Sequence, residues 1–252
     1  MSKRFEGLLC AYCSQRSAVT GDHVFARQFF LPAQRGNLPQ VPTCDPCNNA
    51  KSKLELYLTA VLPFGGRHAD ALANLSGMVE PRLAKNKKLH RHLSQNSSRV
   101  WTRAQFGLQA RSMALPFEPE RVVELFKFVV RGVLFYHRKV RLTDDHFCEV
   151  HLLASDGQKF FDRFMQMRSK GRVTENLGNG TVTYDGIQGL DSEIISVWRF
   201  SLYGGFVLVG PGEESVQIGA LTGPKRVAER TELHAKWVAG KGPWPTTAEK
   251  SS

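Results

Sequence analysis

The clearest hydrophobic pattern in the chain is a helical repeat over residues 120–138. Its apolar residues follow one another at intervals of three or four, so they share one side of a helix, and this side is predicted to be buried. They are Val122, Leu125, Phe126, Val129, Val133 and Tyr136. Weaker patterns of the same kind predict helices over residues 48–62, 67–78 and 156–167. The first of these is expected to end at Pro63, because glycines follow that proline.

The carboxyl-terminal part of the chain has the alternating pattern of half-buried strands. It appears in residues 147–153, 181–184, 194–203, 206–210 and 216–221, and Gly204-Gly205 indicates a tight hairpin between two of them. Because helices precede strands, the order favours an α+β fold with helices on one face of a mainly antiparallel sheet. We expect three units: residues 1–64, an α+β domain of unassigned role over residues 65–239, and a disordered tail over residues 240–252.

Two Cys-x-x-Cys pairs stand at the ends of the first unit, Cys10 with Cys13 and Cys44 with Cys47. Two such pairs in one chain are a strong signal for a tetrahedral four-cysteine zinc site, which holds two distant turns together. Disulfides are the weaker alternative, because the amino terminus lacks the apolar core of a signal peptide. The separation, residues 14–43, is longer than in a simple zinc ribbon, so a further element is expected between the pairs.

The segment between the cysteine pairs contains Asp22-His23, and Asn48 directly follows the second pair. A carboxylate and a carboxamide oxygen are suitable ligands for a hard divalent cation, and an imidazole can accept a proton from water near neutral pH. Neighbouring residues of a strand point to opposite faces, so Asp22 and His23 could serve one site only if the strand twists or ends there. Asn49 is an alternative to Asn48 as the second ligand.

These residues resemble the motif of the HNH endonucleases, a family whose core is a hairpin and a helix around one catalytic metal. The resemblance covers about residues 8–60 and includes Asp22-His23-Val24, Asn37-Leu38, Cys47-Asn48 and Lys51. The chain departs from many members at Phe25-Ala26-Arg27, where they have proline soon after His-Val, and in the longer distance from Asn37 to Cys44.

The resemblance implies a ββα-metal domain with a structural zinc ion and a catalytic Mg²⁺ or Mn²⁺. In this interpretation Asp22 and Asn48 hold the catalytic ion, His23 is the general base, and Asn37 fixes the loop and orients the base. The implied activity is hydrolysis of phosphodiester bonds, most directly those of double-stranded DNA. A non-catalytic zinc-containing module that binds nucleic acid is an alternative, and so is a regulated nuclease effector of a defence or toxin system.

The charge of the chain also favours a nucleic-acid partner. The formal net charge is +11, and residues 81–111 carry many Lys and Arg residues but no Asp or Glu. Clustered positive charge attracts a polyanion and releases its counterions. The tract is expected to be part helix and part loop, with Trp101 buried. The predicted phosphate contacts are Arg27, Lys51, Lys53, Lys85, Lys87, Lys88 and Arg91.

The remaining sequence features limit where the protein acts. No apolar run reaches the 18 residues that suggest a membrane span, and no signal-peptide core is present, so we expect a cytoplasmic protein that makes no membrane contact. The second domain offers a surface for a homodimer or for a regulatory partner.

Overall fold

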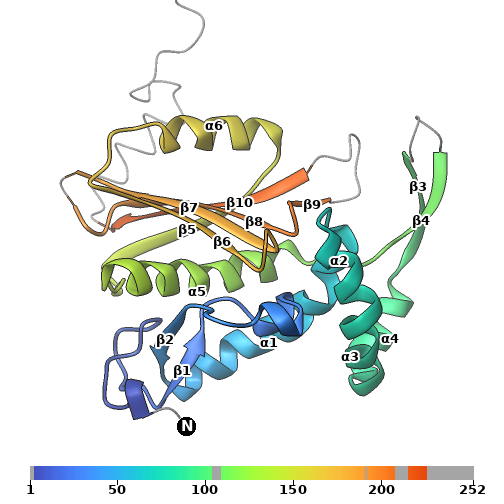
Figure 1. Ribbon diagram of the computed structural model, residues 1–252, viewed down its shortest axis with the longest axis horizontal. Helices are drawn as coiled ribbons and strands as arrows, with labels where there is room; N and C mark the ends of the chain where they lie inside the picture. The colour runs from blue at the N-terminus through green and yellow to red at the C-terminus, as the bar shows by residue number, and fades with distance from the viewer. Residues whose placement is uncertain (1–2, 104–108, 191, 208–214, 226–252) are drawn as a thin grey trace, which may run out of the picture.

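The computed structural model describes residues 3–103, 109–190, 192–207 and 215–225 (Figure 1). Helices and antiparallel sheets are combined in it, which confirms the predicted α+β class. The predicted tail, residues 240–252, lies outside the described residues. No helix in the described part of the chain is long and apolar enough to cross a bilayer.

The main sheet is antiparallel and lies at the centre of the molecule. Its strands follow the spatial order β5 (His146–Leu153), β10 (Ser215–Pro224), β8 (Ser196–Leu202), β7 (Val182–Gln188) and β6 (Gly171–Leu177). The short strand β9 (Phe206–Val207) pairs with β10. The hairpin expected at Gly204-Gly205 is therefore wrong, because the chain turns there and β9 pairs with the later strand instead of with β8.

Two helices cover opposite faces of this sheet, α5 (Pro119–Arg138) and α6 (Ser155–Met165) (Figure 1). The expectation that all helices pack on one face is thus wrong. The apolar side of α5 meets the sheet directly, and the ring centroids of Phe126 and Phe200 lie 5.2 Å apart. A second, smaller apolar cluster lies beneath α6 and includes Phe161, Met165 and Val197.

The amino-terminal part forms a hairpin followed by a long helix on the other side of α5. Strand β1 (Thr20–His23) pairs antiparallel with β2 (Gln40–Thr43), and α1 (Asp45–Gly65) follows at once. Three short 3₁₀ turns accompany them, at Lys3–Phe5, Arg27–Phe29 and Pro32–Gln34. Helix α1 continues past Pro63, where an end was expected. The proline frees the carbonyl of Thr59 from its helical partner, and Arg82 donates a hydrogen bond of 2.9 Å to that oxygen.

The apolar core is continuous across the expected boundary between residues 64 and 65. Phe25, which follows the hairpin strand, packs against Tyr184 of β7 with ring centroids 5.4 Å apart. Helix α5 comes so close to the hairpin that a Cβ at Gly132 would stand 2.9 Å from Val24. Glycine at position 132, inside a strong helix, is explained by this close approach. The hairpin is therefore fixed against the sheet layer through α5.

A helical segment connects α1 to α5 and carries a second hairpin. It comprises α2 (Ala69–Asn74), a π-helical turn (Leu75–Val79), α3 (Glu80–Lys85), α4 (Lys87–Gln95), β3 (Ser98–Arg103) and β4 (Gln109–Ala114). Strands β3 and β4 pair with each other as a separate two-stranded sheet. The expectation of helix and loop in this tract is thus correct for α3 and α4 but misses the hairpin.

Candidate functional site

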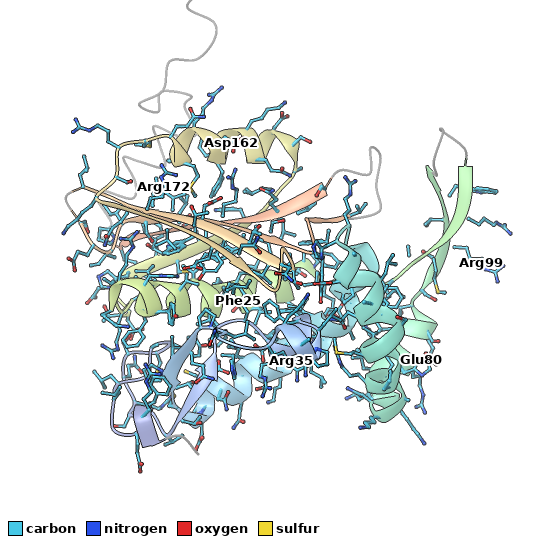
Figure 2. All side chains as sticks on the ribbon, viewed as in Figure 1. Phe25, Arg35, Glu80, Arg99, Asp162 and Arg172 are labelled. Carbon is cyan, nitrogen blue, oxygen red and sulfur yellow. The ribbon has the colours of Figure 1, made fainter. Side chains whose placement is uncertain are left out.

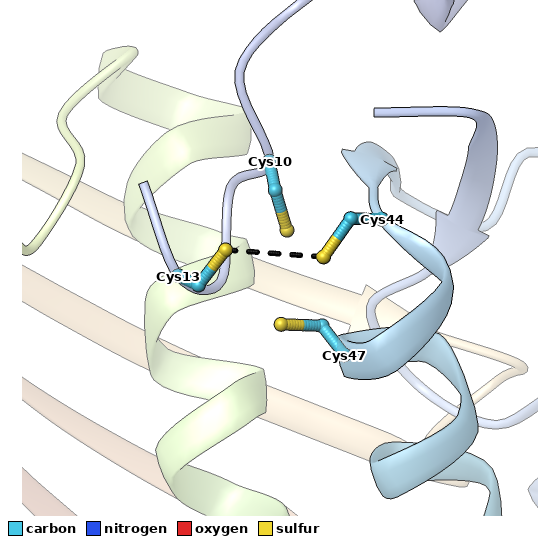
Figure 3. A group of neighbouring side chains, drawn as sticks. All are labelled: Cys10, Cys13, Cys44 and Cys47. Carbon is cyan, nitrogen blue, oxygen red and sulfur yellow. Dashed lines mark hydrogen bonds between the residues drawn. The ribbon is translucent and has the colours of Figure 1, made fainter. Parts of the chain in front are cut away.

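The four cysteines of the two Cys-x-x-Cys pairs come together at the start of α1 (Figure 3). Cys10 and Cys13 lie in a tight turn before β1, in which the Ser14 N–H donates to the Cys10 carbonyl oxygen. Cys44 is the N-cap of α1 and Cys47 lies in its first turn. The four sulfur atoms all lie within 4.8 Å of one another.

The spacing of these sulfur atoms fits a tetrahedral metal ion. A Zn–S bond of about 2.3 Å requires sulfur atoms about 3.8 Å apart at the corners of a tetrahedron. The Cys13 and Cys44 sulfur atoms are 3.8 Å apart. The cysteines therefore form a group that could hold a metal ion such as zinc.

The thiols of the cluster differ in acidity. Burial alone would raise the pKa of Cys13, but backbone N–H groups of Gln15 and Arg16 outweigh it and lower the pKa to about 7. Burial raises the pKa of Cys47, and the neighbouring Cys10 raises it further. Four thiolates in one place therefore need a cation to balance their charge, which agrees with the geometry of a metal site.

Asp22 lies on β1 with its carboxylate toward α1. The Tyr12 hydroxyl donates a hydrogen bond of 2.7 Å to Oδ2, and the ammonium nitrogen of Lys51 is 2.9 Å from the same oxygen. Both contacts fall on Oδ2, so Oδ1 is the oxygen to which a further ligand could bind. The Asp22 side chain is 14% exposed, so the group is reachable from solvent but largely enclosed.

Lys51 is the least exposed charged residue of this region, with a side chain that is 1% exposed. Its Nζ lies 2.9 Å from Asp22 Oδ2, 2.5 Å from Glu55 Oε1 and 2.7 Å from the His23 carbonyl oxygen. These acceptors match the three N–H donors of an ammonium group. The prediction that Lys51 contacts phosphate is therefore corrected: its charge is inside the protein, in an ion-pair network with two carboxylates.

His23 is the last residue of β1, which meets the condition that the strand end there. Its Nε2 lies 2.8 Å from the side-chain nitrogen of Gln40, the residue opposite it on β2. Burial lowers the pKa of His23, and the positive charge of Arg27 lowers it further. The imidazole is therefore held in its neutral form at neutral pH by its surroundings.

The asparagines predicted for the site lie at different places. Asn48 is in the first turn of α1, partly buried, three residues before Lys51 and so on the same side of the helix. Asn49 beside it is exposed. Asn37 is exposed in the turn before β2, with φ +57°, a left-handed conformation that asparagine tolerates better than most residues. The residue that contacts His23 is Gln40.

Three residues of the site were missed by the sequence reasoning: Tyr12, Gln40 and Glu55. Glu55 had a signal, because a Glu four residues after a Lys on a helix indicates an ion pair. Tyr12 and Gln40 had none that distinguishes them from ordinary surface residues. Their roles depend on the register of β1 and β2 and on the turn at Cys10.

The other predicted phosphate contacts all lie at the surface. These are Arg27 after β1, Lys53 on α1, and the residues Lys85, Lys87, Lys88 and Arg91 of α3 and α4. The α3 and α4 residues are separated from the cysteine cluster by the length of α1, which is about 30 Å for its 21 residues. The structure thus has two separate basic areas instead of one.

Comparison of the chain with models of protein families, with curated proteins and with solved structures found no match.

Proposed function

We propose that the protein is a metal-dependent endonuclease of HNH type that hydrolyses phosphodiester bonds of DNA. One observation carries the proposal. The carboxylate of Asp22 and the imidazole of His23 lie at the end of a hairpin strand, beside the first turns of a helix and next to four clustered cysteines. Hairpin, helix and cysteine cluster together provide a rigid support for a site with few polar groups.

In this proposal the cysteines hold a structural zinc ion. A site with four cysteine ligands has no open position for substrate, so zinc serves to connect the turn before β1 to the start of α1. The turn at Cys10 also carries Tyr12, whose hydroxyl holds the Asp22 carboxylate. Zinc binding would therefore fix the orientation of Asp22 through a residue between the ligands.

Asp22 and Asn48, with Asn49 as the alternative to Asn48, would hold Mg²⁺ or Mn²⁺ beside the zinc-supported turn. When bound, such an ion neutralises the charge that develops on the departing 3′ oxygen. Asp22 offers Oδ1 for this purpose, since both of its hydrogen bonds fall on Oδ2. Two protein oxygens are sufficient for an ion that keeps most of its waters.

His23 would take the proton from the attacking water. A general base needs a free lone pair, and the Gln40 amide decides which ring nitrogen has one. With its oxygen turned toward Nε2, Gln40 accepts the Nε2–H and leaves the lone pair of Nδ1 free. Gln40 thus takes the positioning role that the family resemblance assigns to Asn37.

A second function is favoured by the contact between Lys51 and Asp22. The ammonium group already compensates the carboxylate at a distance of 2.9 Å, as expected of a site that holds no second cation. On this alternative the domain is a non-catalytic zinc-containing module that binds nucleic acid, and the Asp22–Lys51–Glu55 network only stabilises the hairpin against α1.

Incubation of supercoiled plasmid with the zinc-loaded protein and Mg²⁺ or Mn²⁺ tests the two functions. The nuclease predicts cleavage that falls about 10²- to 10⁴-fold in His23→Ala, with unchanged zinc content and circular dichroism. His151→Ala, an exposed histidine on β5, is the matched control and should cut normally. Retarded migration without cutting supports the binding module. Equal cutting by His23→Ala and the wild type would overturn the proposed mechanism.

A further inference from the structure

The hairpin of β3 and β4 is a ribbon that projects beyond the rest of the molecule (Figure 1). Its strands pair over six positions, from Ser98 opposite Ala114 to Arg103 opposite Gln109. A two-stranded ribbon that pairs with no further strand gains little stability from its own contacts. Its presence on the surface therefore calls for a role other than supporting the core.

The register divides the ribbon into two different faces. Arg99 stands opposite Met113, and Trp101 stands opposite Arg111. Residues opposite each other, and residues two apart along a strand, share a face. One face therefore carries arginine together with large apolar side chains, whereas positions 98, 100, 110, 112 and 114 on the other face have small residues.

The face with arginine and tryptophan is open to solvent. Trp101 is 64% exposed and Met113 is 66% exposed. The Arg111 guanidinium carbon lies 5.5 Å from the centroid of the Trp101 ring. Arg99 is exposed and points away from the body of the protein (Figure 2). Trp101 was expected to be buried; instead it is held on the outside next to a cation, an arrangement suited to contact with a partner.

Positive charge continues from the ribbon onto the helices at its base. Exposed Lys85, Lys87, Lys88 and Arg91 lie on α3 and α4, and α4 ends three residues before β3 begins. The sequence from residue 81 to residue 117 has no Asp or Glu. The complementary partner is therefore a polyanion with aromatic or methyl groups that can meet Trp101 and Met113.

We propose that the β3–β4 ribbon binds in the major groove of double-stranded DNA, while the cations of α3 and α4 contact the flanking phosphates. The major groove of B-form DNA is about 12 Å wide and admits a two-stranded ribbon. Arg99 and Arg111 then reach acceptors on guanine or on phosphate, and Trp101 and Met113 reach thymine methyl groups. The deep, narrow major groove of A-form RNA excludes the ribbon.

This proposal rests on the proposed function for its partner class, nucleic acid, but concerns binding and not hydrolysis. The ribbon and the hairpin site lie toward opposite ends of α1, whose 21 residues span about 30 Å. That distance equals about one turn of DNA. A test that contains no catalytic ion therefore examines the ribbon separately from the chemistry.

Fluorescence anisotropy with a labelled 30-base-pair duplex measures the binding directly. Zinc-loaded protein is used without added Mg²⁺ or Mn²⁺, at several salt concentrations. Arg99→Ala/Arg111→Ala should weaken binding at least tenfold and lower the salt dependence by about 0.9 per lost phosphate contact. Trp101→Ala should weaken it at least several-fold. Arg163→Ala/Arg168→Ala, which removes two exposed arginines near α6, is the charge-matched control and should bind as the wild type does.

Three results would overturn the proposal. The first is equal loss of affinity in the ribbon variant and the control variant. The second is equally tight binding of an RNA duplex with the same dependence on Arg99 and Arg111. The third is Trp101-dependent binding of single strands only. Binding that depends on the ribbon but is never followed by cleavage would refute the nuclease and support the ribbon. Cleavage with DNA binding unaffected by the ribbon variant would do the opposite.

Discussion

Replacing Lys51 with methionine removes the ammonium group that lies between Asp22 and Glu55 and keeps a side chain of similar length. The Lys51 side chain is 1% exposed, and those of Asp22 and Glu55 are 14% and 15% exposed. The variant therefore leaves two largely enclosed carboxylates without their cation. Lys51→Met is expected to destabilise the fold, not merely to change the surface charge.

The magnitude follows from the degree of burial. Removing one partner of a buried ion pair costs about 3–5 kcal/mol, and the partial exposure of both carboxylates favours the lower end. In a chain of this size each kcal/mol lowers the melting temperature by about 2–4 °C, so a loss of about 3 kcal/mol corresponds to about 6–12 °C. The cation–π distance of 5.9 Å between Lys51 and the Tyr12 ring adds little to this figure.

The loss should depend on pH in a definite direction. Burial already raises the pKa of Glu55 above 4.5, and Lys51 acts against that rise. Without Lys51 the folded-state pKa rises further, so the folded variant takes up a proton before the unfolded chain does as the pH falls. The stability deficit relative to the wild type is therefore largest near pH 7 and shrinks toward pH 4.5.

Thermal unfolding followed by circular dichroism between pH 4.5 and 7.5 measures both effects. Lys53→Met removes an exposed lysine two residues away and is the matched control, with an expected change within about 0.5 kcal/mol. Any loss of zinc at low pH affects both variants equally, so the difference between them is the quantity to compare. Equal melting temperatures for the two variants, or a deficit that grows as the pH falls, would refute the interpretation.

Three further predictions concern the metal, a buried histidine and the sheet. Native mass spectrometry should find one zinc ion in the wild type and in Cys148→Ser but none in Cys44→Ser, which should also unfold at lower temperature; a zinc-free wild type would contradict this. Burial lowers the pKa of His137 from 6.5 to about 4, so stability should be lost as the pH falls below 6.5. Urea unfolding should show a loss of about 1–2 kcal/mol, reduced by solvent screening, that is absent in His137→Gln. Gly186→Ala should cost about 1–3 kcal/mol in the same assay because its Cβ would overlap the buried Trp198 ring, and a neutral result would refute that packing.

Elements with a strong apolar period could be predicted from the sequence. The helix expected at 120–138 is α5 (Pro119–Arg138), and the strand expected at 147–153 is β5 (His146–Leu153). Their periodicity shows because one side of each meets the core. The cysteine cluster was also predicted, since the spacing within each pair fits a shared metal.

The features that were missed depend on contacts between distant residues. The β3–β4 ribbon has arginine among its large side chains, so no apolar alternation marks it. Lysine is almost never fully buried, so nothing in the sequence placed Lys51 inside; its burial depends on Asp22, from another element, as well as on Glu55. β9 pairs with β10 because the chain turns between β8 and β9, and a glycine pair does not specify which neighbour a strand will choose.

The central claim is that Asp22 and the first turn of α1 hold a divalent cation beside a zinc-supported turn. Anomalous diffraction at the manganese edge, from crystals soaked in Mn²⁺, tests it most directly. The account predicts a manganese peak within about 2.5 Å of a carboxylate oxygen of Asp22 and close to Asn48 or Asn49, distinct from a zinc peak among the four cysteines. Density that keeps the Lys51 ammonium on Asp22, with no manganese near that carboxylate, would contradict it.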